Sequence, residues 1–154
     1  MSYRGLKKDS NEWVYGSHRH YIVPSELPLS VDKHFIVPFD DIVGTEIIPE
    51  SLGIYYGLGD KNGKSIFTGD ILELLNNAGE KIRVICDYGI ARRQLVSVSG
   101  TTNLVDIPGF YFLIANGGLT LTYPIVNNYV GKHDLQIMEV IGNIYQNPEL
   151  LSEE

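Results

Sequence analysis

The stretch Gly57–Leu72, GLGDKNGKSIFTGDIL, has the glycines and aspartates that metal and phosphate sites use. A calcium loop of the EF-hand type needs oxygen ligands at positions 1, 3 and 5, glycine at position 6 and glutamate at position 12. Counted from Asp60, position 5 is Lys64, a cation. Positions 6 and 12 are Ser65 and Ile71. These mismatches argue against an EF-hand calcium loop.

The same stretch also fails as a phosphate-binding loop. Its GKS ending fits G-x-x-x-x-G-K-[ST], but Leu58 stands where the first glycine is required. The following IFTGDILEL is typical of a strand rather than of the helix that such a loop precedes. Asn62-Gly63 instead predicts a two-residue type I′ hairpin turn, in which Asp60 accepts backbone N–H groups. The glycines therefore indicate backbone geometry rather than chemistry.

His18 and His20 are two residues apart, which places both side chains on one face of a strand. They could share a metal ion or act in acid–base catalysis, with a third ligand from His34, His133 or a distant carboxylate. The alternative is a polar strand edge with solvated imidazoles. A metal-dependent hydrolase using His18 and His20 is thus one hypothesis. Since no complete catalytic constellation is visible, we predict no catalytic residue, no bound metal and no cofactor.

Lys81, Arg83, Arg92 and Arg93 could form a basic spot on one sheet, which would suit a nucleic-acid-binding β-barrel. The alternative is a solvated face balanced by nearby acids. The formal net charge of −7 favours this second interpretation. Cys86 lies on the apolar side of a strand pattern, so we expect a small buried hydrophobe rather than a nucleophile.

Length and composition narrow the class of protein. The 154 residues suit one domain, or a domain with a small appendage. A single cysteine excludes an intramolecular disulfide and fits a reducing compartment. No apolar run reaches the roughly 18 residues of a membrane helix, and the N-terminal residues have no apolar core like that of a signal peptide. We therefore expect a cytoplasmic protein without membrane contact.

Ten tyrosines with abundant Ile and Val, and little alanine, predict a mainly β fold. Turn signals divide the chain into many short strands, which suggests a small barrel or sandwich. A loop is expected at residues 100–109, a bulge at Gly142 and a short C-terminal helix at residues 147–151. The strands are expected at residues 12–16, 19–23, 33–37, 54–56, 70–75, 81–87, 90–98, 110–115, 119–126 and 136–145.

The motif YYGLGDKNGKSIFTGDIL, followed near the end by EVIGNIYQNPELL, strongly resembles the YopX-like family of phage and prophage proteins. The opening YRGLKKDSNEWVYG and the segment IIPESLGIYYG are similar to that family as well. Tyr56, Gly59 and Thr68 depart from its usual pattern but leave the turn residues intact. The resemblance implies an SH3-type β-barrel over residues 51–154, preceded by an N-terminal β extension over residues 1–50. It implies no reaction.

On these grounds we expect a phage or prophage accessory protein that is not an enzyme. It would act through protein contacts, as a homo-oligomer or with a host or phage partner protein, in the cytoplasm of a bacterial host. Many short strands leave backbone edges that can pair with another chain. Nucleic-acid binding and metal-dependent hydrolysis remain the two alternatives.

Overall fold

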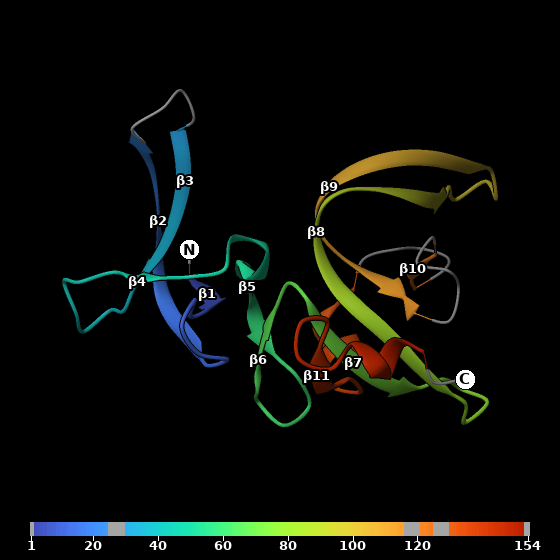
Figure 1. The fold of residues 1–154 in the computed structure, drawn as a ribbon. Coiled ribbons are helices and arrows are strands. Elements are labelled where there is room, and N and C mark those ends of the chain that lie inside the picture. Colours follow the sequence, from blue (N-terminus) through green and yellow to red (C-terminus); the bar gives the residue numbers. More distant parts are fainter. Residues whose placement is uncertain (1, 25–29, 116–120, 125–129, 153–154) are drawn as a thin grey trace. The chain divides into compact units, whose positions relative to one another are not determined.

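The computed structural model describes residues 2–24, 30–115, 121–124 and 130–152. The chain divides into two compact units, Met1–Tyr55 and Tyr56–Glu154, where the sequence predicted a division after residue 50. Both units consist of antiparallel strands, and the described residues contain one short α-helix (Figure 1). The mainly β fold class is therefore confirmed.

In the first unit the strands pair in the order β4-β3-β2-β1-β5. A small buried core of Val14, Ile36 and Ile47 packs against the half-buried Tyr3 and Leu52. The elements in chain order are β1 (Tyr3–Leu6), β2 (Trp13–Pro24), β3 (Ser30–Val37), β4 (Thr45–Glu46), the 3-10 turn η1 (Pro49–Ser51) and the beginning of β5 (Gly53–Gly59).

β2 is one strand of 12 residues, and the prediction of two strands joined at residues 16–18 is wrong. Its first half pairs with β1, as far as Gly16 opposite Tyr3. Its second half pairs with β3, beginning at Ser17 opposite Val37. Because a ladder partner is present on both sides of this point, Gly16-Ser17 is a change of partner and the backbone stays extended.

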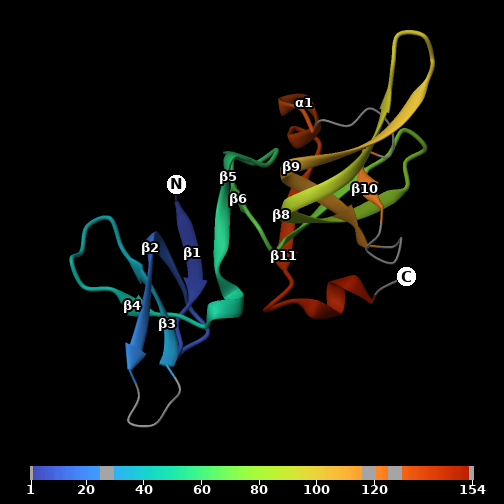
Figure 2. The same ribbon diagram turned by 90° about the horizontal axis from the view of Figure 1, so that it is seen from above.

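In the second unit the sheet order is β10-β9-β8-β7-β11. β6 pairs with the end of β5, and the two are labelled next to each other in Figure 2. Among the described residues this order is linear, with β10 and β11 at its edges, so the closed SH3-type barrel is not confirmed. The further elements are β6 (Ser65–Phe67), β7 (Asp70–Leu75), β8 (Lys81–Val96), β9 (Thr102–Ile114), β10 (Thr122–Tyr123), α1 (Lys132–Leu135), β11 (Glu139–Asn143) and the 3-10 turn η3 (Pro148–Leu151).

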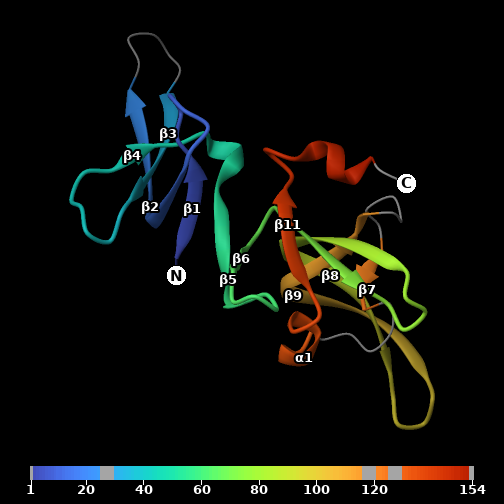
Figure 3. The same ribbon diagram turned by 90° about the horizontal axis from the view of Figure 1, so that it is seen from below.

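Several local predictions hold in this unit. Cys86 is fully buried within the main hydrophobic cluster. The bulge at Gly142 is confirmed, because the register of β11 against β7 shifts between Val140 and Gly142. Both strands are labelled in Figure 3. The C-terminal helix is confirmed as the short 3-10 turn η3. The predicted strand at residues 119–126 lies partly outside the described residues, and its described part contains β10.

The predicted loop at residues 100–109 is wrong, because β9 runs from Thr102 to Ile114. A continuous ladder joins β9 to β8, from Val84 opposite Ile114 to Val96 opposite Thr102. The two strands predicted at residues 81–87 and 90–98 are correspondingly one strand, β8. Turn-type residues in β9 suggested a loop, but pairing with a distant strand overrides that local preference.

Three hairpin turns in the second unit share one arrangement, at residues 60–63, 76–79 and 97–100. In each, the N–H of the last residue, a glycine, donates to the carbonyl oxygen of the first residue over 2.9 Å. The three glycines have φ between 79° and 82°, which costs little without a Cβ atom. The first residue's side chain also accepts an N–H from four residues further on. These first residues are Asp60, Asn76 and Ser97.

The loop at Asp60 therefore has three residues, Lys61 to Gly63, closed by the bond from the Asp60 N–H to the Lys64 carbonyl. A glycine in the left-handed region at the third loop position is typical of three-residue hairpins. The predicted two-residue turn on Asn62-Gly63 is wrong, because the Asp60 side chain starts the turn one residue earlier.

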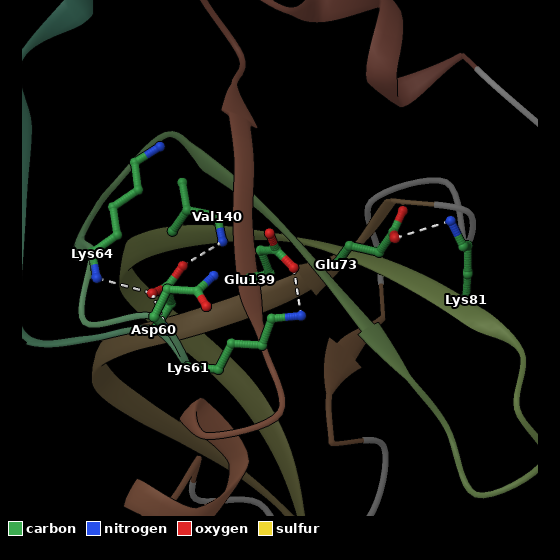
Figure 4. A network of polar contacts seen from close by, with 8 residues as sticks. Asp60, Lys61, Lys64, Glu73, Lys81, Glu139 and Val140 are labelled. Carbon is green, nitrogen blue, oxygen red and sulfur yellow. Dashed lines mark hydrogen bonds and ion pairs between the residues drawn. The ribbon is translucent and has the colours of Figure 1, made fainter.

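Asp60 also ties this hairpin to the edge strand β11. Its Oδ1 accepts the N–H groups of Asn62 and Lys64, both at 2.9 Å. Its Oδ2 accepts the N–H of Val140 at 2.9 Å (Figure 4). The adjacent Lys61 N–H donates to the carbonyl of Met138. One carboxylate, 7% exposed, thus joins segments 80 residues apart.

We expect Asp60→Ala to lower the free energy of unfolding of the second unit by about 3 kcal/mol or more, since it leaves the buried Val140 N–H without its acceptor. Asn76→Ala is the matched control: it removes the same two turn bonds at an exposed site and should cost about 1 kcal/mol. Urea unfolding followed by far-UV circular dichroism measures both.

Hydrogen exchange gives the local measurement. In Asp60→Ala the Val140 amide should exchange faster by at least about tenfold relative to wild type, and in Asn76→Ala it should not. Equal costs for the two variants would contradict the linking role of Asp60.

Candidate interaction surface

The distal halves of β8 and β9 form a two-stranded ribbon, from the Tyr88–Phe110 pair to the turn at Ser97 (yellow in Figure 2). β7 pairs with β8 only from Lys81 to Ile85. β10 pairs with β9 only at two residues of its other half. Within the described part of the chain, neither outer edge of the ribbon has a ladder partner. An isolated two-stranded ribbon is at best marginally stable in water, so this one gains from being covered.

The buried side of β8 changes at the pair Gly89–Gly109. Before this pair the even positions Val84 and Cys86 are fully buried, and Ile85 between them is 7% exposed. After it the odd positions Ala91 and Arg93 are buried, each 5% exposed. The register has no break there, and the two strands curve together (Figure 1). Glycine often marks such a bend in a strand. Ile90, Arg92 and Val96, at even positions beyond Gly89, consequently face solvent.

We call these outward residues the ribbon face, and it combines apolar and charged side chains. Ile90 is 73% exposed and Leu104 is 69% exposed. Single exposed apolar residues are ordinary, but several on one unsupported ribbon indicate an interaction site. The ribbon face comprises Ile90, Arg92, Val96, Leu104 and Asp106.

A charge pair lies within the ribbon face. Arg92 and Asp106 are direct cross-strand neighbours. Arg92 Nε lies 3.0 Å from Asp106 Oδ1, and Nη2 lies 3.4 Å from Oδ2. The hydrogen bond from Arg92, with its charge, lowers the pKa of Asp106. Such an exposed pair contributes little to stability, but it gives the ribbon face both signs of charge.

The four basic residues predicted as one spot are distributed over different places. Lys81 Nζ lies 3.2 Å from Glu73, and Arg83 Nε lies 3.3 Å from the same carboxylate. Burial raises the pKa of Glu73, but the hydrogen bonds from Lys81 and Arg83 outweigh it and lower that pKa. Arg92 pairs with Asp106, and Arg93 is buried on the opposite side of the ribbon.

Each exposed cation of this set therefore has an acidic neighbour, and the structure does not bring the four together as an unbalanced basic patch. Figure 4 shows the same pattern nearby, where Lys61 forms an ion pair with Glu139 beside the Lys81–Glu73 pair.

The histidines predicted on one strand face form a stacked row in the first unit. His34 stacks on His18 with ring centroids 5.1 Å apart and on His20 with centroids 4.4 Å apart. His18 Nε2 lies 2.9 Å from His34 Nδ1, so one ring donates its N–H to the other. His20 Nε2 lies 3.3 Å from Asp32. Of the third partners that the sequence offered, the structure thus places His34 beside the predicted pair.

His133 lies in α1 of the second unit. Across the described ranges, no three His, Cys, Asp or Glu side chains converge on a possible metal position. None of the helices among those residues has the length and apolar character to cross a membrane.

A family model described as YopX protein matches residues 2–152. The chain belongs to the YopX family. No curated protein matches it. The match to the YopX model covers both units, so the ribbon and the histidine row both lie within the matched residues.

Sequence reasoning missed the ribbon face of this YopX chain, because it assigned residues 100–109 to a loop. Leu104, Val105 and Ile107 are apolar residues within that stretch and were the available signal for a strand. The close approach of His34 to His18 follows from pairing between β2 and β3, which single-strand periodicity does not contain.

We expect acidification to destabilise the first unit through His18. Burial, and then the charges of His34 and His20, lower the pKa of His18, and Tyr3 is the other ring against it. A lowered pKa means that the unfolded chain binds more protons than the folded one. Stability is therefore intact above the unfolded pKa of about 6.5 and is lost as pH falls toward the folded value.

Thermal unfolding at about pH 7.5 and about pH 5, followed by the fluorescence of Trp13, tests this, since Trp13 is the chain's one tryptophan and lies in the first unit. His18→Gln should reduce the loss of Tm at low pH, whereas His133→Gln in α1 should leave it unchanged. An equal loss in wild type and His18→Gln would refute the assignment.

Proposed function

We propose that this chain is a phage or prophage accessory protein that catalyses no reaction, works in the bacterial cytoplasm and acts by binding a second copy of itself through the ribbon face. The observation that carries the proposal is the exposure of Ile90 and Leu104 on a two-stranded ribbon without supporting strands among the described residues. Membership of the YopX family supports the phage context.

Burial of the ribbon face supplies the driving force. Fully burying an exposed Ile or Leu side chain contributes about 1.5–3 kcal/mol. In a twofold dimer each copy contributes Ile90 and Leu104, so four such side chains leave water. The second copy can also cover the open edges of the ribbon, because the backbone groups of an unpaired strand edge readily form hydrogen bonds with another chain.

The charges of the ribbon face favour a second copy over a different protein. A twofold interface brings the same patch together from both subunits, so residue i meets residue j and j meets i. Arg92 and Asp106 are adjacent and opposite in charge. Arg92 of one copy can therefore approach Asp106 of the other, and each patch is complementary to itself.

We also propose that the second unit is the SH3-type barrel that the family resemblance implies, with the first unit as its N-terminal β extension. What supports this is that the antiparallel strands β7, β8, β9 and β11 contribute to one apolar cluster, and that β8 and β9 curve strongly (Figure 1). Strand curvature of this kind is what closure of a small barrel requires.

Light scattering after size exclusion at about 10 μM protein tests the self-association, because wild type should elute as a dimer. Ile90→Lys and Leu104→Lys should each weaken the dimer by at least about thirtyfold, as expected for a central apolar interface residue. Val98→Lys is the matched control: Val98 is fully exposed in the turn outside the ribbon face, and this variant should remain dimeric.

A charge exchange identifies the geometry of the contact. Arg92→Asp and Asp106→Arg should each be monomeric alone, because like charges then meet across the twofold axis. Mixing the two variants should restore a dimer containing one copy of each. A strictly monomeric wild type, or dimers unaffected by both lysine substitutions, would overturn the proposal.

A further inference from the structure

Three histidines share one face of the β2–β3 ladder in the first unit, where the two strands run side by side (Figure 1). His20 lies directly opposite His34, and His18 is two residues from His20 on the same strand. Alternate residues of a strand point to one face, and diagonal neighbours across two strands lie within reach of aromatic rings. The ladder therefore brings together His18 and His34, which are 16 residues apart in the chain.

The closest nitrogens of this group have the spacing of two metal ligands. His18 Nε2 and His34 Nδ1 lie 2.9 Å apart. Histidine nitrogens bind first-row divalent ions such as Zn²⁺ at about 2.0–2.1 Å. At that bond length two nitrogens are about 2.9 Å apart on neighbouring corners of a square-planar site and about 3.4 Å apart at a tetrahedral angle. The observed spacing matches the square-planar arrangement, which is typical of Cu²⁺ and Ni²⁺.

The protonation of the pair suits a metal ion. Burial, and then the charges of His34 and His20, lower the pKa of His18, and the neutral imidazole is the form that binds metals. When an ion enters, the ring that donates the shared N–H moves this proton to its other nitrogen, so both facing nitrogens present lone pairs and no proton is released. The χ2 torsion of histidine is broad, so both rings can turn toward one ion.

His20 and Asp32 hold the pair in place. The His20 ring stacks on His34 with centroids 4.4 Å apart, and its Nε2 lies 3.3 Å from Asp32 Oδ1. Residues that orient a metal ligand from outside commonly carry such a carboxylate. Because the Nε2 of His20 already faces Asp32, we expect His20 to orient His34, and the carboxylate adds negative charge near a bound dication.

The neighbouring cations do not oppose a metal ion at this place. Arg19 and Lys33 alternate with the histidines along β2 and β3, so their side chains point to the opposite face of the ladder. There Lys33 Nζ lies 3.7 Å from Glu46. On the histidine face the Tyr3 ring lies against His18, with centroids 5.6 Å apart. The surroundings of the histidine pair are therefore aromatic and acidic.

We infer that His18 Nε2 and His34 Nδ1 together bind one Cu²⁺ or Ni²⁺ ion. Within the described ranges no three metal-binding side chains converge, so this site has two protein ligands and water fills its other positions. The two ligands come from different strands, and the ion links β2 to β3. The inference is independent of the proposed dimer, because the histidines lie in the first unit and the ribbon face lies in the second.

This inference departs from the sequence expectation of no bound metal and from the pair that the sequence offered. Spacing along one strand suggested His18 with His20, whereas the register of β2 against β3 brings the nitrogens of His18 and His34 together. The two pairs make different predictions for single variants, so an experiment can distinguish them.

Titration of the full chain, without an affinity tag, with Cu²⁺, Ni²⁺ and Zn²⁺ salts tests it by calorimetry. Wild type should bind Cu²⁺ most tightly, as the general order of divalent ions predicts, and Ni²⁺ more tightly than Zn²⁺, because the 2.9 Å spacing suits square-planar sites. Electron paramagnetic resonance of the Cu²⁺ form should show a tetragonal signal split by nitrogen ligands. In nuclear magnetic resonance spectra Cu²⁺ should broaden the amide signals of His18 and His34 before that of His133.

The four histidines of the chain give matched variants. His18→Gln and His34→Gln should each weaken Cu²⁺ binding by more than about a hundredfold, which exceeds the usual cost of losing a residue that only orients a ligand. His20→Gln should weaken it by no more than about tenfold. His133→Gln in the second unit is the control and should leave the affinity unchanged. Far-UV circular dichroism checks that each variant is folded, and the broadening in wild type tests the site without any substitution.

Three results would overturn the inference. They are no binding of Cu²⁺ or Ni²⁺ at about 100 μM, an unchanged Cu²⁺ affinity in folded His34→Gln, or a hundredfold loss in His133→Gln. A monomeric wild type would refute the proposed dimer without affecting these titrations.

Discussion

The carboxylate of Asp60 accepts three backbone N–H groups and joins two segments, the β5–β6 turn and β11, that otherwise belong to separate ladders. It fixes the turn that ends β5, and through Val140 it holds the first residues of β11. Because Val140 also pairs with Leu72 of β7, the edge of the main sheet and the β5–β6 hairpin share one anchor. A buried carboxylate is stable only with its acceptor positions used, so this arrangement strongly restricts where β11 can lie.

The parts of the fold that could be predicted are turns whose residues lie close together in the chain. Hairpins at Asp60, Asn76 and Ser97 each need a short polar side chain at the first position and a glycine at the fourth, and both lie within four residues. At Asp60 the location of the turn followed from the sequence, whereas its size did not; the turn at Ser97 begins where a strand over residues 90–98 was expected. The loop has three residues because the Asp60 side chain accepts the N–H of Lys64. The Asn62-Gly63 pair by itself favoured a loop of two residues.

The features that could not be predicted depend on a partner strand far away in sequence. β2 stays extended through Gly16 because β1 and β3 pair with its two halves. β9 continues through Pro108-Gly109 because β8 lies opposite. The third bond of Asp60 reaches a residue 80 positions away. In the two strands a local turn signal was outweighed by backbone hydrogen bonds that the local sequence does not specify, and the Asp60 bond likewise depends on a partner that the local sequence does not specify.

Arg92 and Arg93 show how strand alternation changes the interpretation of two adjacent basic residues. As neighbours in the chain they suggested a single basic spot, but adjacent residues of a strand point to opposite faces. The curve at Gly89 then decides which face is buried, so Arg93 is buried and Arg92 faces solvent beside Asp106. The two arginines, adjacent in the chain, therefore belong to two different surfaces of the ribbon.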